Sequence, residues 1–285
     1  MAALELGLIS SAWGDTRVGL EEGMRKAKEI GFDTYDIFED PLDIDDDTRA
    51  LIRRTSDELG LPIRSCVCVN FGFVDFNPSV QRFALQRAKA YVDQSAYLGA
   101  RNVLLVIGEY YWDCEVFPAD AIWEMALQRT RELGAYAAEH GIEIVVELEP
   151  FSQALVKDAH ELARFIRDVD LPNVRANADI SHLHLAGSSF DDVAVLSGLI
   201  GHIHLSDCDG NVHGDLPPGR GATPIKEYLQ AVVDTGFSEG TVSIELEYSP
   251  DPEAIVAWVE EAYRETAKIM DELGVRSADG SRAGR

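Results

Sequence analysis

Basic residues are scarce in this 285-residue sequence. It contains 25 lysines and arginines against 50 aspartates and glutamates, which gives a formal net charge of −25 at pH 7. A surface this acidic repels the phosphates of nucleic acids and the head groups of anionic membranes, so we expect neither as a partner. The simplest role for the excess charge is to keep the protein soluble.

Long apolar runs and paired cysteines are also missing. No stretch approaches 18 consecutive apolar residues, so no transmembrane helix is expected, and the first residues lack the basic and apolar regions of a signal peptide. The four cysteines show no zinc-ligand spacing. Cys66 and Cys68 alternate within an apolar run, which is typical of thiols in a buried strand. These features predict a cytoplasmic protein with reduced cysteines.

Short β-rich runs alternate regularly with amphipathic helical runs along the chain. There are eight such strand–helix units, which is the number in a (β/α)8 barrel. An open doubly wound sheet is the alternative, but no glycine-rich turn follows the first predicted strand. We predict an α/β protein with a single (β/α)8 TIM barrel over residues 1–274 and a disordered tail over residues 275–285.

A barrel of this kind carries its function at the carboxyl ends of its strands. Along the last four predicted strands, one set of alternate residues is apolar and suited to packing against helices, and the other set is polar and faces the interior. Unpaired carboxylates crowded there repel one another, and a divalent cation would relieve that repulsion. Three carboxylates and one imidazole suit Mn2+, with Mg2+ or Co2+ as alternatives. The predicted ligands are Glu147, Asp179, His204 and Glu245.

Each predicted ligand, taken alone, is more simply interpreted as part of an ion pair inside the barrel or as a solvated group at its rim. Their recurrence on successive strands favours the metal site. Glu149 and Glu247 share the inward parity of Glu147 and Glu245. They lie farther along each strand, at the loop edge, so the first glutamate of each pair is the predicted ligand.

Short motifs occur in the same order as these strands. GIEIVVE ends at Glu147, DISH begins at Asp179, HIHLSD contains His204, PGRG forms a turn, and SIE ends at Glu245. In this order they resemble the motifs of the xylose-isomerase-like barrels, a superfamily of sugar isomerases and epimerases that includes the ketose 3-epimerases. The resemblance covers roughly residues 4–272.

The resemblance implies that the four predicted ligands hold the metal and that the substrate is a keto sugar. The metal would acidify a C–H bond next to the carbonyl, and Glu147 and Glu245 would be the catalytic bases that remove and return its proton. On the pattern of the ketose epimerases, His182 and Arg220 would contact the substrate. For Arg220, a surface ion pair is the alternative.

Other segments resemble the catalytic subunits of C-glycoside deglycosidases, which are barrels of the same superfamily. These segments are GEYYW, ELEPF, DISHLHLAG and SDCDGNVHGDLPPGRG. This second resemblance implies a lyase that cleaves the C–C bond of a 3-oxo-glycoside by β-elimination, working with a small β-rich second subunit. We place the lyase first and a sugar isomerase or ketose 3-epimerase second, and in either case we expect an oligomer.

Aromatic residues follow two of the predicted strands. Tyr111 and Trp112, after the fourth strand, are candidates to line a pocket for an aryl group, with packing on the rim as the alternative. Trp13, after the first strand, is a candidate for stacking on a sugar, with a place in the core as the alternative.

Three further functions fit this sequence less well. A DNA-repair endonuclease with several metals needs histidines at the ends of the second to fourth strands, which here read DIFED, VCVNFGF and VIGEYYW. A non-catalytic sugar-binding barrel would have no need to retain all four ligands. A hydrolase with a serine nucleophile is not indicated, because the one G-x-S-x-G match, GFSEG at residues 236–240, precedes a predicted strand instead of following one.

Overall fold

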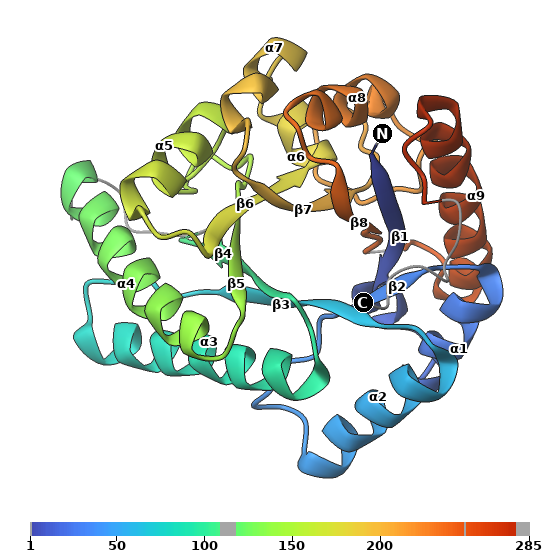
Figure 1. Ribbon diagram of the computed structural model, residues 1–285, viewed down its shortest axis with the longest axis horizontal. Coiled ribbons are helices and arrows are strands. Elements are labelled where there is room, and N and C mark those ends of the chain that lie inside the picture. Colours follow the sequence, from blue (N-terminus) through green and yellow to red (C-terminus); the bar gives the residue numbers. More distant parts are fainter. Residues whose placement is uncertain (1, 109–117, 248, 278–285) are drawn as a thin grey trace.

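The computed structural model describes residues 2–108, 118–247 and 249–277. Its strands are all parallel and pair in sequence order, and the last strand pairs with the first to close a barrel (Figure 1). The predicted (β/α)8 fold is confirmed. The strands are β1 (Ala3–Ile9), β2 (Thr34–Ile37), β3 (Ile63–Asn70), β4 (Asn102–Ile107), β5 (Glu143–Glu147), β6 (Val174–Asp179), β7 (Ile200–Leu205) and β8 (Glu239–Ile244).

Helices connect successive strands and surround the barrel (Figure 1). The Asp45 side chain caps the start of α2 by accepting a hydrogen bond from Thr48 N, and Gly60, with φ of 56°, ends that helix in the left-handed conformation. Among the described residues, no helix is both long enough and apolar enough to cross a membrane. The α-helices are α1 (Leu20–Ile30), α2 (Asp46–Leu59), α3 (Pro78–Leu98), α4 (Ala119–Glu139), α5 (Ala159–Val169), α6 (Ile180–Leu185), α7 (Phe190–Val193), α8 (Ile225–Asp234) and α9 (Ile255–Leu273).

The connection between β6 and β7 contains a helix that the sequence pattern did not predict. α6 begins directly after β6, and its N-cap is Asp179, whose Oδ1 accepts a hydrogen bond from His182 N at 2.7 Å. A carboxylate is favourable at a helix N-terminus because the first backbone N–H groups lack partners within the helix. The cap therefore fixes the Asp179 side chain at the mouth of the barrel.

Side chains of the strands divide between two apolar clusters, as the alternation in the sequence predicts. On β5, Ile144 and Val146 pack in the large cluster between the strands and the helices. Val145, between them in sequence, belongs instead to the small cluster inside the barrel. The other buried members of that inner cluster are Ile9, Val67, Leu104 and Val106.

Part of the segment that we expected to be disordered is paired with β1. Leu4 N donates a hydrogen bond to Val275 O at 2.8 Å, and Ser277 N donates one to Leu4 O at 2.9 Å. The Val275 side chain is buried. Residues 275–277 therefore extend the barrel domain past its predicted boundary, and the remainder of the predicted tail lies outside the described residues.

Gly7 lies on the inner face of β1, where there is no room for a larger side chain. A Cβ atom at this position would lie 2.5 Å from Thr34 Oγ1 and 2.7 Å from Ser243 Oγ. We expect Gly7→Ala to lower the free energy of unfolding by about 1–3 kcal/mol, because the neighbouring strands must move apart. In the control Gly214→Ala, the added Cβ meets no atom closer than 3.8 Å. If urea denaturation finds the same decrease in the free energy of unfolding for the two variants, this account of Gly7 is wrong.

Candidate active site

Four ionisable side chains meet at the carboxyl ends of β5 to β8. Glu147 ends β5, Asp179 ends β6, His204 lies near the end of β7 and Glu245 directly follows β8. All four are buried, and one possible ligand atom from each lies within 4.8 Å of the others. His204 Nδ1 is 3.3 Å from both Glu147 Oε1 and Glu245 Oε2. The structure thus brings together the four residues that the sequence predicts as metal ligands.

The crowding of these groups shifts their pKa values. Burial raises the pKa of Glu245, and the attraction of His204 offsets only part of that effect. Burial alone would lower the pKa of His204, but the carboxylates of Glu147 and Glu245 outweigh it and hold the pKa well above its ordinary value. Burial alone would raise the pKa of Asp179, but the positive charges of His182 and His204 outweigh it and lower the pKa. The surroundings therefore favour the charged forms of Asp179 and His204 although both are buried, and they favour the neutral form of Glu245.

Two polar atoms in this cluster have neither a hydrogen bond nor an ion pair within the described part of the chain. They are Asp179 Oδ2 and His204 Nε2, and both are buried. Leaving such an atom without a partner costs about 1–3 kcal/mol. A divalent cation would satisfy these atoms, and carboxylates with one imidazole form a suitable donor set. The residues therefore fit a divalent metal.

Neighbouring side chains orient the predicted ligands. Asn177 Nδ2 donates to Glu147 Oε1 at 2.7 Å, and Ser181 Oγ donates to Asp179 Oδ1 at 2.9 Å. Each bond occupies one oxygen of a carboxylate and leaves the other oxygen for a different partner. Hydrogen bonds of this kind fix the geometry of metal ligands in proteins.

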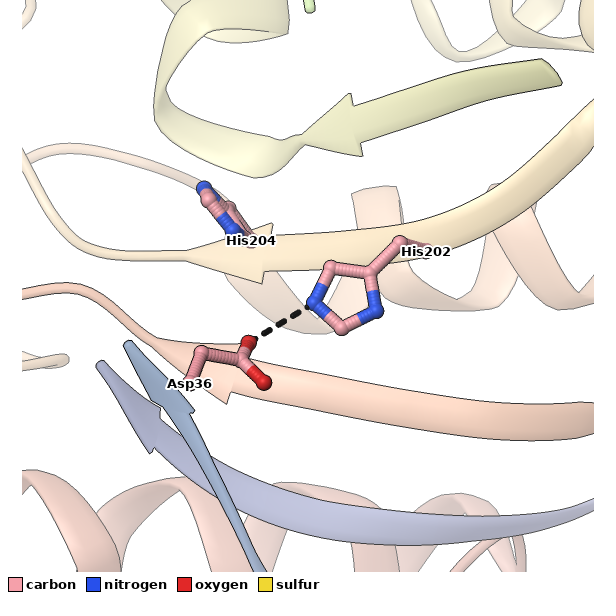
Figure 2. A group of neighbouring side chains, drawn as sticks. All are labelled: Asp36, His202 and His204. Atoms are coloured by element: carbon pink, nitrogen blue, oxygen red, sulfur yellow. Dashed lines mark hydrogen bonds and ion pairs between the residues drawn. The ribbon is translucent and has the colours of Figure 1, made fainter. Parts of the chain in front are cut away.

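A buried pair lies deeper in the barrel, below His204. Figure 2 shows the ring of His202 directed at Asp36, with His204 nearer the carboxyl end of the same strand. His202 Nε2 is 2.9 Å from Asp36 Oδ2, which also accepts a hydrogen bond from Ser243 Oγ, and Asp36 Oδ1 accepts one from Ser65 N. Because Asp36 is satisfied by these donors, we interpret the pair as support for His204, whose ring centroid is 5.4 Å from that of His202.

A cavity of about 980 Å3 opens over the predicted ligands, and Glu147, Glu245 and His182 line it. His182 Nδ1 lies 2.9 Å from Leu148 O, so this nitrogen carries the hydrogen and donates it. The other ring nitrogen, Nε2, is buried and makes no hydrogen bond within the described chain. His182 therefore lies where the resemblance places a substrate contact, with one nitrogen available to bind a hydroxyl group.

The ring of His213 lies 4.8 Å from that of His182 and also lines the cavity. Burial, together with the charge of His182, lowers the pKa of His213 to about 4, so its imidazole is neutral at pH 7. Asp215, two residues on, is fully buried and accepts a hydrogen bond from Ser206 Oγ at 2.9 Å. Burial raises the pKa of Asp215 well above its ordinary value, and the charge of Glu245 raises it further. His213 therefore adds a neutral base to the cavity, and the buried carboxyl group of Asp215 lies behind it, with Oδ1 3.5 Å from His213 Nε2.

One carboxylate accepts four of the hydrogen bonds that hold the loop carrying His213 and Asp215. Asp207 is buried, and its two oxygens accept hydrogen bonds from four backbone N–H groups at 2.8–3.0 Å. Gly221 is required at one of these contacts, since a Cβ atom there would lie 2.3 Å from Asp207 Oδ1. The four donors are Cys208, Gly219, Gly221 and Thr223.

Arg220, a predicted substrate contact, points to the outside of the barrel. Its Nε and Nη2 atoms bind the two carboxylate oxygens of Glu261 at 2.8 and 2.7 Å. Its guanidinium also lies over the ring of Trp258, 4.6 Å from the centroid. The structure therefore shows the surface ion pair that was the alternative for this residue, because Glu261 and Trp258 on α9 hold the guanidinium there.

Trp13, the predicted sugar-stacking residue, is part of the core. It is buried, its Nε1 donates to Tyr35 Oη at 2.9 Å, and its ring packs against Gly23 of α1. The described lining of the cavity does not include it. Tyr111 and Trp112 lie outside the described residues.

The sequence does not indicate the side of the cavity that faces β2 to β4. Phe38, Phe83 and Arg87 line this side. Nothing in the sequence distinguishes them from ordinary residues of an amphipathic helix or a strand end. Their position becomes apparent only when α3 is packed beside β3.

The comparisons with known families agree with this geometry. The family described as xylose isomerase-like TIM barrel matches the chain over residues 24–273. This chain belongs to the xylose isomerase-like TIM barrel family. The family resemblance drawn from its strand motifs is thereby confirmed.

Members of the xylose isomerase-like TIM barrel family that resemble this chain include sugar epimerases. The fructoselysine 3-epimerase of Shigella flexneri is 24% identical over 248 residues, which are 82% of this chain and 87% of that protein. Among solved structures, the IOLI protein with a bound zinc atom has a TM-score of 0.82 at 16% identity and covers 94% of this chain and 99% of its own. The Escherichia coli 3-keto-D-glucoside 4-epimerase has a TM-score of 0.74 at 18% identity and covers 90% and 98%. At these identities the two structures show a shared fold.

This member of the xylose isomerase-like TIM barrel family is an enzyme. Its relatives support a sugar epimerase or isomerase, which the sequence analysis placed second. They give no support for the C-glycoside lyase that it placed first.

We expect Asp207→Ala to lower the free energy of unfolding by about 2–4 kcal/mol, because it leaves buried backbone donors without an acceptor. Asp209→Ala is the matched control. The exposed Asp209 in the same loop accepts hydrogen bonds only from Asn211 N and Val212 N within the described chain, and its loss is expected to cost less than about 1 kcal/mol. Urea denaturation of both variants tests the difference, and a similar cost for the two would show that Asp207 does not hold the loop.

Proposed function

We propose that this enzyme is a divalent-metal-dependent epimerase or isomerase of a keto sugar. The observation that carries the proposal is the placement of Glu147 and Glu245. They come from β5 and β8, they line one cavity, and each lies 3.3 Å from the same nitrogen of His204. The 3-epimerases among the relatives support this reaction type.

A divalent cation held by the four predicted ligands would polarise the carbonyl and a neighbouring hydroxyl of the sugar, and so acidify the C–H bond next to the carbonyl. Glu147 and Glu245 belong to strands that are not neighbours in the barrel, so they approach a sugar between them from different sides. One carboxylate removes the proton and the other returns one to the opposite face of the same carbon, which inverts its configuration. Return of the proton to the former carbonyl carbon, together with transfer of the hydroxyl proton to the former carbonyl oxygen, gives isomerisation instead.

The remaining residues of the cavity hold the sugar between these two bases. His182 presents its unpartnered Nε2 to a hydroxyl group, and the neutral His213 lies beside it. Orientation of this kind matters because proton transfer requires the base within hydrogen-bond reach of the reacting C–H group.

We further propose Mn2+ as the metal, because carboxylates dominate the donor set. The cytoplasm is the proposed location, and the free, buried thiols of Cys66, Cys68 and Cys208 support a reducing compartment. An oligomer remains a prediction that size-exclusion chromatography would test. The small β-rich second subunit remains a prediction tied to the lyase reaction.

Glu147→Gln and Glu245→Gln are each expected to reduce turnover at least about 100-fold, because each removes a metal ligand and a base. Glu143→Gln and Glu239→Gln at the starts of the same strands are matched controls, since both residues lie at the opposite end of the barrel. We would measure kcat for a ketose panel. Near-native rates in either of the first two variants would exclude that glutamate from the reaction.

Treatment with EDTA is expected to lower activity at least about 100-fold, and Mn2+ is expected to restore it. Metal analysis of the reconstituted protein should then find about one ion per chain, and fewer in Asp179→Asn. If the metal-stripped protein keeps full activity, the carboxylates form a structural ion-pair cluster.

Proton NMR in D2O distinguishes the proposed reaction from the lyase reaction. With a panel of ketoses, we expect deuterium to enter the carbon next to the carbonyl while a new epimer or isomer appears. With a 3-oxo aryl C-glycoside, we expect no free aglycone. Release of the aglycone, without exchange in any ketose, would overturn the proposed reaction in favour of elimination.

A further inference from the structure

The active-site cavity has a second side, formed by β2, β3, β4 and α3, that proton transfer between Glu147 and Glu245 does not require. The two sides belong to one continuous cavity of about 980 Å3. This volume is at the top of the range of about 300–1,000 Å3 that is typical of pockets for drug-sized ligands. A free hexose is much smaller than such a ligand, so the cavity has room for a substrate that extends past the sugar.

The wall of this second side is mainly apolar. Phe38 follows β2 and packs against the apolar cluster inside the barrel, and Phe83 projects from α3 with 61% of its surface exposed. Both lie on the side of the mouth opposite the strands that carry the predicted ligands. The apolar residues that line this side include Phe38, Ile44, Val67, Val69, Phe83 and Val106.

Among the described residues, this second side offers no free cation to an anionic substrate. Arg87 is the sole lysine or arginine among the described lining residues. Its guanidinium is already occupied: it pairs with Asp40 at 2.6 Å and donates to Val69 O at 2.8 Å and to Tyr91 Oη at 3.2 Å. A phosphate or carboxylate group placed against these residues would lose its hydration without gaining an opposite charge, which is unfavourable.

The acidic residues of this side are compensated or solvated. Asp40 is neutralised by Arg87, and Glu39 accepts a hydrogen bond from Ser10 Oγ at 2.7 Å. Asp43 is exposed at the rim. The wall therefore presents mainly apolar side chains, and its described acidic groups do not need a bound cation to balance them.

We infer that this second side binds an uncharged apolar group, most favourably an aromatic ring, carried by the keto sugar. The preferred substrate is then a keto-glycoside rather than a free or phosphorylated ketose. Phe38 and Phe83 would pack against the ring, and aromatic pairs add to the free energy gained from burying apolar surface. The inference rests on the proposed function for the position of the sugar, whereas the apolar wall itself stands on the geometry of the cavity.

Calorimetric binding of two unreactive probes tests this inference without depending on turnover. We expect phenyl β-D-glucoside to bind about tenfold or more tightly than methyl β-D-glucoside. Phe83→Ala, a change at an exposed position, is expected to reduce that ratio at least about threefold. Phe190→Ala is the matched control, because Phe190 is also an exposed phenylalanine on a helix but lies outside this cavity, against Tyr228. Its ratio should equal that of the unaltered protein.

Three results would overturn the inference. The first is a binding ratio near one, including the absence of measurable binding for both probes. The second is an equal loss of preference in Phe83→Ala and Phe190→Ala. The third is tighter binding of fructose 6-phosphate than of fructose. If instead the phenyl preference holds but no keto sugar exchanges deuterium, the inference about the cavity stands and the proposed reaction fails.

Discussion

Burying three carboxylates beside one imidazole is the constraint on which the rest of the barrel mouth depends. Like charges at this distance repel, and removing them from water adds a further cost. His204 supplies the first compensation, because its ring nitrogen lies between Glu147 and Glu245. Asn177 and Ser181 supply hydrogen bonds, and a divalent ion would supply the remainder. The strands, the α6 cap and the Asp36–His202 pair all restrict the positions that these charges can take.

The closed parallel barrel makes such a cluster possible. Every strand ends at the same mouth, so residues that are distant in sequence converge there without a specialised loop. The half formed by β5 to β8 carries the charged groups, whereas the half formed by β2 to β4 and α3 carries apolar ones. One cavity therefore combines the proposed site for proton transfer with the proposed wall for an apolar group, and the two lie on different strands.

The sequence was enough to predict the order of the strands and which of their residues face the interior. It was also enough to predict that the four predicted ligands meet at one end of the barrel. These predictions follow from the two-residue period of a strand and from the geometry of a parallel barrel. What could not be derived depends on contacts between distant segments. Arg220 binds Glu261 on the outside of the barrel, and Trp13 donates a hydrogen bond to Tyr35 in the core. The pairing of residues 275–277 with β1 and the apolar wall around Phe83 depend on the tertiary packing, which no short motif records.

The hydrogen bonds of Asp207 have a consequence for how this enzyme can diversify. They tie the path of the loop to backbone amides at residues 208, 219, 221 and 223 and to no side chain among residues 209–214. Exposed positions between these anchors, such as Asn211 and Val212, are therefore open to substitution while the loop keeps its course, whereas Gly210 has a left-handed backbone and His213 lines the cavity. Mutational libraries, or natural drift, can explore new contacts with a substrate there and leave the predicted ligands on the strands untouched.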